Sequence, residues 1–385
     1  MSNQFSKWVA CWGNATSITD RKEAVYAKDI TLRYPIRICF SGSKLRFHFS
    51  NLTGTEPITI TSAFVAKNTD NRNTPYQPVS ITFTQSSSVS ILPGNEILSD
   101  EISIDITAGE TVEVSLYFDN FTQMNAGTLI TGPLSLGKYS YGNYSQSRKL
   151  PANLTRSTNW FYFLNTIDIF TEEKNHALIC FGDSITAQDW PDYLSIRAFE
   201  QGFHNVSIIR RAVSGTRILR QYDCITYAAY GLKGSTRFPI EIKVAGASAV
   251  IIQHGINDII HPVGEEVNPF RPWSDMPTLK EMEDAVKEIY VSHAKALGLK
   301  VWSGTLLPIY GWRTYNENRD LIREEFNEWL RTAPEFDGCI DFDKAVRDPQ
   351  NIRCFAPGFD SGDHLHPSAK AYQAMADSIP EILLK

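Results

Sequence analysis

Residues 177–186 are Ala-Leu-Ile-Cys-Phe-Gly-Asp-Ser-Ile-Thr, an apolar run that leads directly into a Gly-Asp-Ser turn. The run has no polar alternation, which is typical of a strand buried on both faces of a parallel sheet. Residues 249–252 and 301–305 form similar runs, and helical apolar stripes separate or follow these strands. The stripes are Met282, Ala285, Val286 and Ile289, and then Ile322, Phe326, Trp329 and Leu330. This alternation predicts an α/β domain with a parallel sheet over residues 173–385.

The first half of the chain has a different spacing of apolar residues, with a period of two. Leu45, Phe47 and Phe49 alternate with polar residues, and turn signals separate runs at 58–65, 79–83 and 112–118. Short alternating strands at this spacing predict an all-β, jelly-roll-like sandwich over residues 1–172. Residues 134–158, rich in Ser, Tyr, Asn and Gly, are expected to form a long loop that runs back toward the second domain.

Length and charge restrict the partners. A chain of 385 residues with a formal net charge of −6 suits two domains and argues against nucleic acid or an anionic membrane as the main partner. A small molecule or oligosaccharide is the better match. The N-terminus lacks an apolar leader, so we expect a cytoplasmic protein, with a trimmed secreted form as the alternative. The six cysteines are widely spaced, which favours buried free thiols.

Ser184 lies just beyond the first apolar run, where parallel sheets place their active sites. A serine hydroxyl needs a base, and His366 follows Asp363 by three residues, so that Asp363 can orient the imidazole. The competing interpretation is that Asp363 caps a helix over 367–383. His364 is the rival base, but adjacent side chains point apart. His254, at a strand end, is expected to be structural.

An acyl-transfer reaction also needs donors for the developing oxyanion. The backbone N–H of Ser184, the backbone N–H of Gly215 and the side-chain amide of Asn257 can supply them, because Gly215 and Asn257 each follow an apolar strand. An ordinary turn glycine and an Asx-turn residue are the simpler alternatives. Asp189, Trp190 and Tyr310 are candidates to line the substrate pocket, although core packing explains the aromatic residues equally well. No metal-ligand spacing or phosphate loop occurs, so we expect chemistry without a cofactor.

The four blocks around Ser184, Gly215, Asn257 and His366 resemble those of the GDSL-type, or SGNH, hydrolases. Residues 8–13, 45–52 and 93–100 extend the resemblance to a two-domain subgroup of acylhydrolases. It implies a three-layer, flavodoxin-like α/β/α domain after a β-sandwich, and ester hydrolysis through an acyl-serine. Arg210 and Thr216 depart from the pattern of relatives, which often have Asn at the first position and Asn or Asp at the second. The segment 187–191 after the serine is also short.

We therefore expect hydrolysis of small acyl esters, with acetyl esters of carbohydrates as the first choice. A lipase or phospholipase acting on longer chains is one alternative, and a carbohydrate-binding protein without activity is another. The sandwich is expected to act as a rigid platform rather than as an independent sugar-binding domain. Oligomeric state stays open at this stage.

Overall fold

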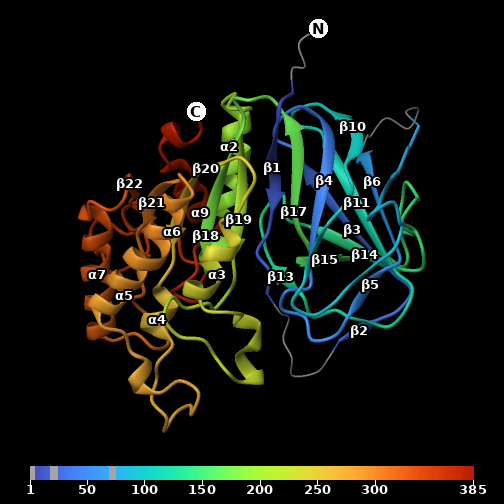
Figure 1. Cartoon of the computed structure of the whole chain (residues 1–385). Coiled ribbons are helices and arrows are strands. Elements are labelled where there is room, and N and C mark those ends of the chain that lie inside the picture. Colours follow the sequence, from blue (N-terminus) through green and yellow to red (C-terminus); the bar gives the residue numbers. More distant parts are fainter. Residues whose placement is uncertain (1–4, 18–24, 69–74) are drawn as a thin grey trace.

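The computed structural model describes residues 5–17, 25–68 and 75–385. Figure 1 shows two parts side by side, a strand-rich part built by the blue-to-green half of the chain and a sheet covered by helices. The change from antiparallel to parallel strands falls between β17 (Leu164–Thr171) and β18 (His176–Gly182).

The N-terminal part contains two antiparallel sheets. One has the order β1 (Lys7–Gly13), β17, β4 (Gly42–Ser50) and β10 (Ile102–Ile106), with β9 (Glu96–Leu98) also paired to β4. The other has the order β15 (Arg156–Thr158), β14 (Gly137–Tyr141), β3 (Ile30–Arg37), β11 (Thr111–Phe118), β6 (Ser62–Asn68) and β7 (Val79–Ile81). Three short pairs complete the described strands: β2 (Tyr26–Ala27) with β12 (Thr122–Gln123), β13 (Gly127–Leu129) with β16 (Trp160–Tyr162), and β5 (Ile58–Ile60) with β8 (Val89–Ile91). The alternating Leu45, Phe47 and Phe49 are fully buried, which confirms the period-two prediction.

The C-terminal part is a parallel sheet with the order β19 (Val206–Ala212), β18, β20 (Ala247–Gln253), β21 (Lys300–Gly304) and β22 (Gly338–Ile340). The chain starts in β18, moves to one side for β19 and to the other for the remaining strands. This is the flavodoxin-like order, and its switch point lies at the carboxyl end of β18, where sheets of this kind generally bind their ligands. The predicted α/β fold is confirmed.

Helices cover both faces of this sheet. The helices and helical turns are α1 (Ser184–Ala187), α2 (Trp190–Glu200), η1 (Ile225–Tyr230), α3 (Gly234–Glu241), α4 (Ile256–Ile260), η2 (Trp273–Asp275), α5 (Leu279–Ala285), the π-helical η3 (Val286–Val291), α6 (Ser292–Ala296), α7 (Glu317–Thr332), α8 (Phe342–Val346), α9 (Ala369–Asp377) and η4 (Glu381–Leu383). The crossovers place α2 on one face, where it packs against α9, and α3, α5 and α7 on the other. None of the helices in the described residues is long and apolar enough to cross a membrane.

The two parts share an interface along β19, which is the edge strand of the parallel sheet and lies beside β1 (Figure 1). The Ala10 N–H donates to the carbonyl of Ala245 at 2.9 Å, and the Ser207 hydroxyl donates to the carbonyl of Ala10 at 2.5 Å. Ile209 of β19 is buried in the same apolar cluster as the sandwich core. The sandwich therefore covers an edge that would otherwise be open to pairing with another chain.

Three local expectations were wrong. Residues 134–158 contain β14 and β15 rather than one long loop, although the start of the segment does reach the second part. Residues 58–65 are divided between β5 and β6. The C-terminal helix begins at Ala369, because Pro367 forms an extended bridge with Asp360 and Ser368 caps the helix, and it ends at Asp377. All six cysteines are free as expected, but only Cys11 and Cys180 are fully buried.

Candidate active site

Ser184 is the first residue of α1, directly after β18. Asp183 precedes it as the helix cap, and its carboxylate accepts a hydrogen bond from the Ile185 N–H at 3.0 Å. The sequence reasoning missed this four-residue helix because it is too short to show a period. Ser184 is 9% exposed, so most of this residue is buried.

His366 and Asp363 complete a chain of contacts with this serine. The Ser184 Oγ lies 2.9 Å from His366 Nε2, and His366 Nδ1 lies 2.7 Å from Asp363 Oδ2. The other Asp363 oxygen accepts the backbone N–H groups of Leu365 and His366 at 3.0 and 2.8 Å. Partial burial would raise the pKa of Asp363, but the hydrogen bonds from His366 and Leu365 outweigh it and lower that pKa. The carboxylate is thus held ionised against the imidazole.

The two histidines that were considered besides His366, His364 and His254, have different partners. His364 has a positive φ of 64° and pairs with Asp360 at 2.5 Å, so it turns away from Asp363. His254 is buried between the Tyr290 hydroxyl and the Thr216 carbonyl, at 2.9 and 3.2 Å. Desolvation, helped by the charge of Arg237, lowers the pKa of His254 to about 3. These contacts agree with the expectation that His254 is structural.

Gly215 lies in the turn after β19, with a φ of 78° that favours glycine. A Cβ at this position would lie 2.1 Å from Tyr230 Cδ1, so the tyrosine ring packs directly on the glycine. The sequence reasoning missed Tyr230, because nothing in its local pattern links η1 to this turn.

Asn257 and Asp258, at the start of α4, bind the chain that follows Gly215. The Asn257 amide donates to the Thr216 carbonyl at 3.0 Å. Asp258 accepts the N–H groups of Ile218 and Leu219 at 2.7 and 2.9 Å, and burial raises its pKa to about 6. These bonds join the second and third blocks even though Thr216 departs from the family pattern.

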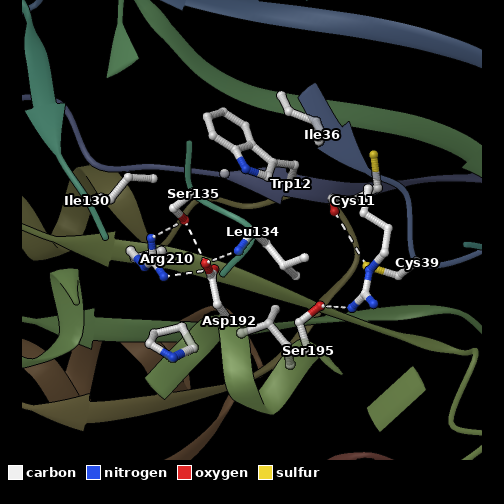
Figure 2. A pocket seen from close by; sticks show the side chains of 14 residues that line it. Cys11, Trp12, Ile36, Cys39, Ile130, Leu134, Ser135, Asp192, Ser195 and Arg210 are labelled. Atoms are coloured by element: carbon white, nitrogen blue, oxygen red, sulfur yellow. Dashed lines mark hydrogen bonds and ion pairs between the residues drawn. The ribbon is translucent and has the colours of Figure 1, made fainter. Parts of the chain in front are cut away.

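Arg210, the other departure, is buried and forms an ion pair with Asp192 of α2 at 2.9 Å (Figure 2). It also donates to the Ser135 hydroxyl at 3.0 Å, and Asp192 accepts the Leu134 N–H at 2.9 Å. The next residue, Arg211, donates to the carbonyls of Asn14 and Asn165 and to the Thr166 hydroxyl. Consecutive arginines on β19 thus bind the N-terminal part from opposite faces of the strand.

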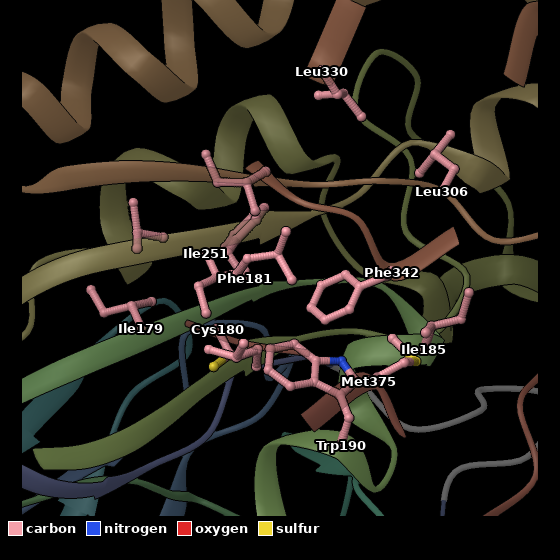
Figure 3. Packing of buried hydrophobic residues seen from close by; sticks show 14 of the residues in the cluster. Ile179, Cys180, Phe181, Ile185, Trp190, Ile251, Leu306, Leu330, Phe342 and Met375 are labelled. Atoms are coloured by element: carbon pink, nitrogen blue, oxygen red, sulfur yellow. The ribbon is translucent and has the colours of Figure 1, made fainter. Parts of the chain in front are cut away.

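Trp190, one of the predicted pocket residues, lies in the core instead. Trp190 is completely buried and packs against Phe342 in the core, with Ile185 and Met375 nearby (Figure 3). It cannot stack on a substrate, so this prediction was wrong. The position of Trp190 at the start of α2 directs its ring between that helix and α8.

Asp189 and Tyr310 are not excluded in the same way. Asp189 is half-buried and accepts a hydrogen bond from the Thr131 hydroxyl at 2.5 Å. Tyr310 is half-exposed and contacts Tyr315 edge to face. Their roles as pocket residues stay predictions.

Comparisons with known proteins show which family the chain belongs to. The family model described as GDSL-like Lipase/Acylhydrolase matches residues 178–379, slightly more than half of the chain. No curated protein sequence gave a significant match.

Solved structures with some likeness include an acetyl xylan esterase from Geobacillus stearothermophilus, with 18% identity, a TM-score of 0.40 and coverage of 54% of this chain and 94% of that chain. An alpha/beta hydrolase from the metagenome of Lake Arreo, Spain, has 14% identity, a TM-score of 0.40 and the same coverage. A family two carbohydrate esterase from Cellvibrio japonicus covers 98% of this chain and 97% of its own, with 9% identity and a TM-score of 0.36. These likenesses are too low to add to the assignment, which depends on the family model. The chain belongs to the GDSL-like lipase/acylhydrolase family and is a carboxylic ester hydrolase.

Proposed function

We propose that the chain hydrolyses acetyl esters of carbohydrates through an acyl-Ser184 intermediate. The observation that carries the mechanism is the continuous chain from Ser184 through His366 to Asp363, with contacts of 2.9 and 2.7 Å. A serine, an imidazole and a carboxylate in this order are the parts that activate a hydroxyl for attack on an ester carbonyl.

In the first half of the proposed reaction, His366 Nε2 takes the proton as Ser184 Oγ attacks the acetyl carbonyl. The N–H groups of Ser184 and Gly215 and the second N–H of the Asn257 amide stabilise the oxyanion. The C–O bond to the sugar then breaks, and His366 returns the proton to the leaving hydroxyl. In the second half, His366 Nε2 takes a proton from water as the water oxygen attacks the acyl carbonyl. The bond between that carbonyl and Ser184 Oγ then breaks, His366 returns the proton to Oγ, and acetate leaves.

The preference for a small acyl group and a sugar is supported by the residues beside Gly215. The Tyr230 ring lies on this glycine and leaves little room next to the oxyanion donor, which disfavours long acyl chains. Tyr222, Tyr227 and Tyr230 form a cluster with ring centroids 4.5 to 5.7 Å apart, and Tyr227 and Tyr230 are partly exposed. Such rings offer flat faces on which a sugar can stack.

The test combines labelling with a substrate series. The native chain should react with a fluorophosphonate and hydrolyse p-nitrophenyl acetate, and rates should fall from acetate to butyrate to octanoate. Ser184→Ala should abolish labelling and lower turnover at least about hundredfold. Ser90→Ala, at an exposed position of β8, is the matched control. Retained turnover in Ser184→Ala would refute the mechanism, and faster turnover of octanoate would favour the lipase alternative.

We further propose that residues 1–172 form a platform for the catalytic domain, 173–385. The support comes from β19, the strand that leads to Gly215, because Arg210 and Arg211 connect it to Ser135, Asn14 and Asn165 of the N-terminal part.

A further inference from the structure

The segment 309–315, between β21 and α7, borders the active site at two points. A Cβ at Gly311 would lie 2.9 Å from the ring of His364, which is in the same turn as His366. At the other end, the Thr314 hydroxyl donates to the carbonyl of Ile260, the last residue of the helix that carries Asn257, at 2.8 Å. The segment therefore spans the rim of the site from the histidine turn to the end of α4.

Tyr230 and His261 also lie near the end of α4, on the side of the proposed oxyanion donor Gly215. The Tyr230 ring covers Gly215 and stacks on His261, with ring centroids 5.3 Å apart and planes at 25°. His261 directly follows Ile260, to which Thr314 is bonded. Arg313, the residue before Thr314, is thus placed on the rim near the Tyr230–His261 stack.

Arg313 is exposed, and its guanidinium lies 4.5 Å from the centroid of the Trp312 ring. Among the residues that the structure describes, no carboxylate lies within ion-pair distance of it, and no hydrogen bond engages its guanidinium. Stacking on an indole restricts the side chain without using its N–H donors. This arginine is therefore held in place with its donors available.

The surroundings of Arg313 are also positive. Arg271 donates to the carbonyls of Ile260 and His261, and Arg319 donates to those of Ile259 and Pro262. Both therefore bind the end of α4, and within the described ranges neither has a carboxylate partner. Burial and then the charges of Arg271, Arg217, Arg313 and Arg319 lower the pKa of His261 far below its usual value, which keeps that imidazole neutral. Arg217 of this group pairs with Asp275, whereas no ion pair of Arg271, Arg313 or Arg319 occurs among the described residues. In a chain with a net charge of −6, such a group of arginines points to an anionic ligand.

We propose that Arg313 is a specificity residue that binds a carboxylate on the sugar part of the substrate, so that acetylated oligosaccharides containing a uronic acid are preferred. The inference depends on the proposed esterase function. The planar guanidinium matches a carboxylate in a two-pronged hydrogen-bonded pair, which a neutral hydroxymethyl group cannot replace.

The experiment compares two substrates that differ only at C6, a mono-acetylated methyl glucuronide and the corresponding methyl glucoside, by acetate release. The native chain should show a kcat/KM about tenfold or more higher for the glucuronide, mainly through KM. The preference should shrink when the salt concentration is raised from about 0.05 to about 0.5 M, because salt screens the attraction between exposed charges. Arg313→Gln should remove the preference and leave the glucoside rate within about twofold.

Arg156→Gln is the matched control, because Arg156 is an exposed arginine of β15 without an ion pair in the described residues. It should keep the full preference. Equal rates for the two substrates in the native chain, or a preference that survives Arg313→Gln, would overturn the carboxylate subsite while the esterase function stands. Hydrolysis of neither substrate would overturn both proposals.

A second substrate pair tests which side of the ester carries the charge. Mono-p-nitrophenyl succinate and p-nitrophenyl butyrate differ by a carboxylate on the acyl group. We expect no advantage for the succinate ester. An Arg313-dependent advantage there would contradict the placement on the sugar.

Discussion

The guanidinium of Arg210 lies 2.9 Å from the carboxylate of Asp192, and both side chains are buried beneath the contact between α2 and the N-terminal part. Burial raises the pKa of Asp192, while Arg210 and the hydrogen bonds from Ser135 and Leu134 act in the opposite direction. Asp192→Ala should therefore leave a buried charge without its partner and lower the free energy of unfolding by about 3–5 kcal/mol. Urea denaturation measures the change. The double variant Arg210→Met with Asp192→Leu should lose less than the single variant, and a single-variant loss below about 1 kcal/mol would contradict the prediction.

Asp363→Asn tests the orientation of His366. The amide retains the shape of the side chain but has no negative charge to accept the hydrogen bond from His366 Nδ1–H. We therefore expect kcat on p-nitrophenyl acetate to fall about 10²–10⁴-fold. His364→Asn is the control, because asparagine tolerates the positive φ at that position and His364 pairs with Asp360 instead. Its kcat should stay within about threefold. A larger loss in His364→Asn than in Asp363→Asn would reverse the assignment of the base.

Gly215→Ala tests the backbone donor. The added Cβ would meet the Tyr230 ring at 2.1 Å, so the turn must move and the Gly215 N–H with it. We expect kcat to fall at least about tenfold, because a single oxyanion donor contributes about 10²–10³ in rate when it is removed completely. Gly202→Ala provides a control with a φ of 83° and no atom within 4 Å of the new Cβ. That variant should lose about 1–2 kcal/mol of stability and keep its kcat.

Asp183 predicts a pH dependence of stability. Burial first, and then the charge of Asp258, raise the pKa of Asp183 to about 7 in the folded chain, above its unfolded value. The neutral carboxyl therefore stabilises the fold at low pH, and this contribution is lost as the pH rises through about 7. Asp183→Asn should become more stable relative to the native chain as the pH rises from about 4 to about 7, with a limiting slope of about 1.4 kcal/mol per pH unit, and the difference should level off above about pH 7.

Denaturation at several pH values checks this slope. Asp105→Asn, on the exposed side of β10, should show no such pH-dependent difference. A constant difference between Asp183→Asn and the native chain across the range would show that Asp183 does not change its charge there.

Residues 173–385 expressed alone should be poorly soluble and inactive. Without the sandwich, β19 becomes an open edge, Ile209 is uncovered and Arg211 loses the Asn14 and Asn165 carbonyls. The soluble fraction after expression and the turnover of p-nitrophenyl acetate provide the measurements. Co-expression of residues 1–172 should restore part of both. A soluble, fully active fragment would refute the platform role.

The outline of the fold was predictable because its signals are local. The apolar runs that became β18, β20 and β21 and the alternation in β4 each need only a few neighbouring residues to be recognised. The proximity of Asp363 to His366 was also predictable, since three residues separate them. The limits of the helices were harder to predict from the sequence. Pro367 is typical of a first helical residue, and only the structure shows that it forms a bridge with Asp360.

Contacts between distant elements were not predictable from the sequence. Trp190 could face either a pocket or the core, and only its contact with the Phe342 ring and its complete burial decide in favour of the core. The Arg210–Asp192 pair joins a strand to a helix, and Tyr230 reaches Gly215 from a separate turn. Such pairs depend on how the elements are placed in space, which no local pattern records.

The position of β19 has a consequence for how such a chain can change through evolution. A recombination event that joined this hydrolase half to a different N-terminal half would separate Arg211 from Asn14, Asn165 and Thr166 in one step. The two halves are therefore expected to be inherited together, and substitutions at the surface of β1 that faces β19 should be compensated by changes in the hydrolase half.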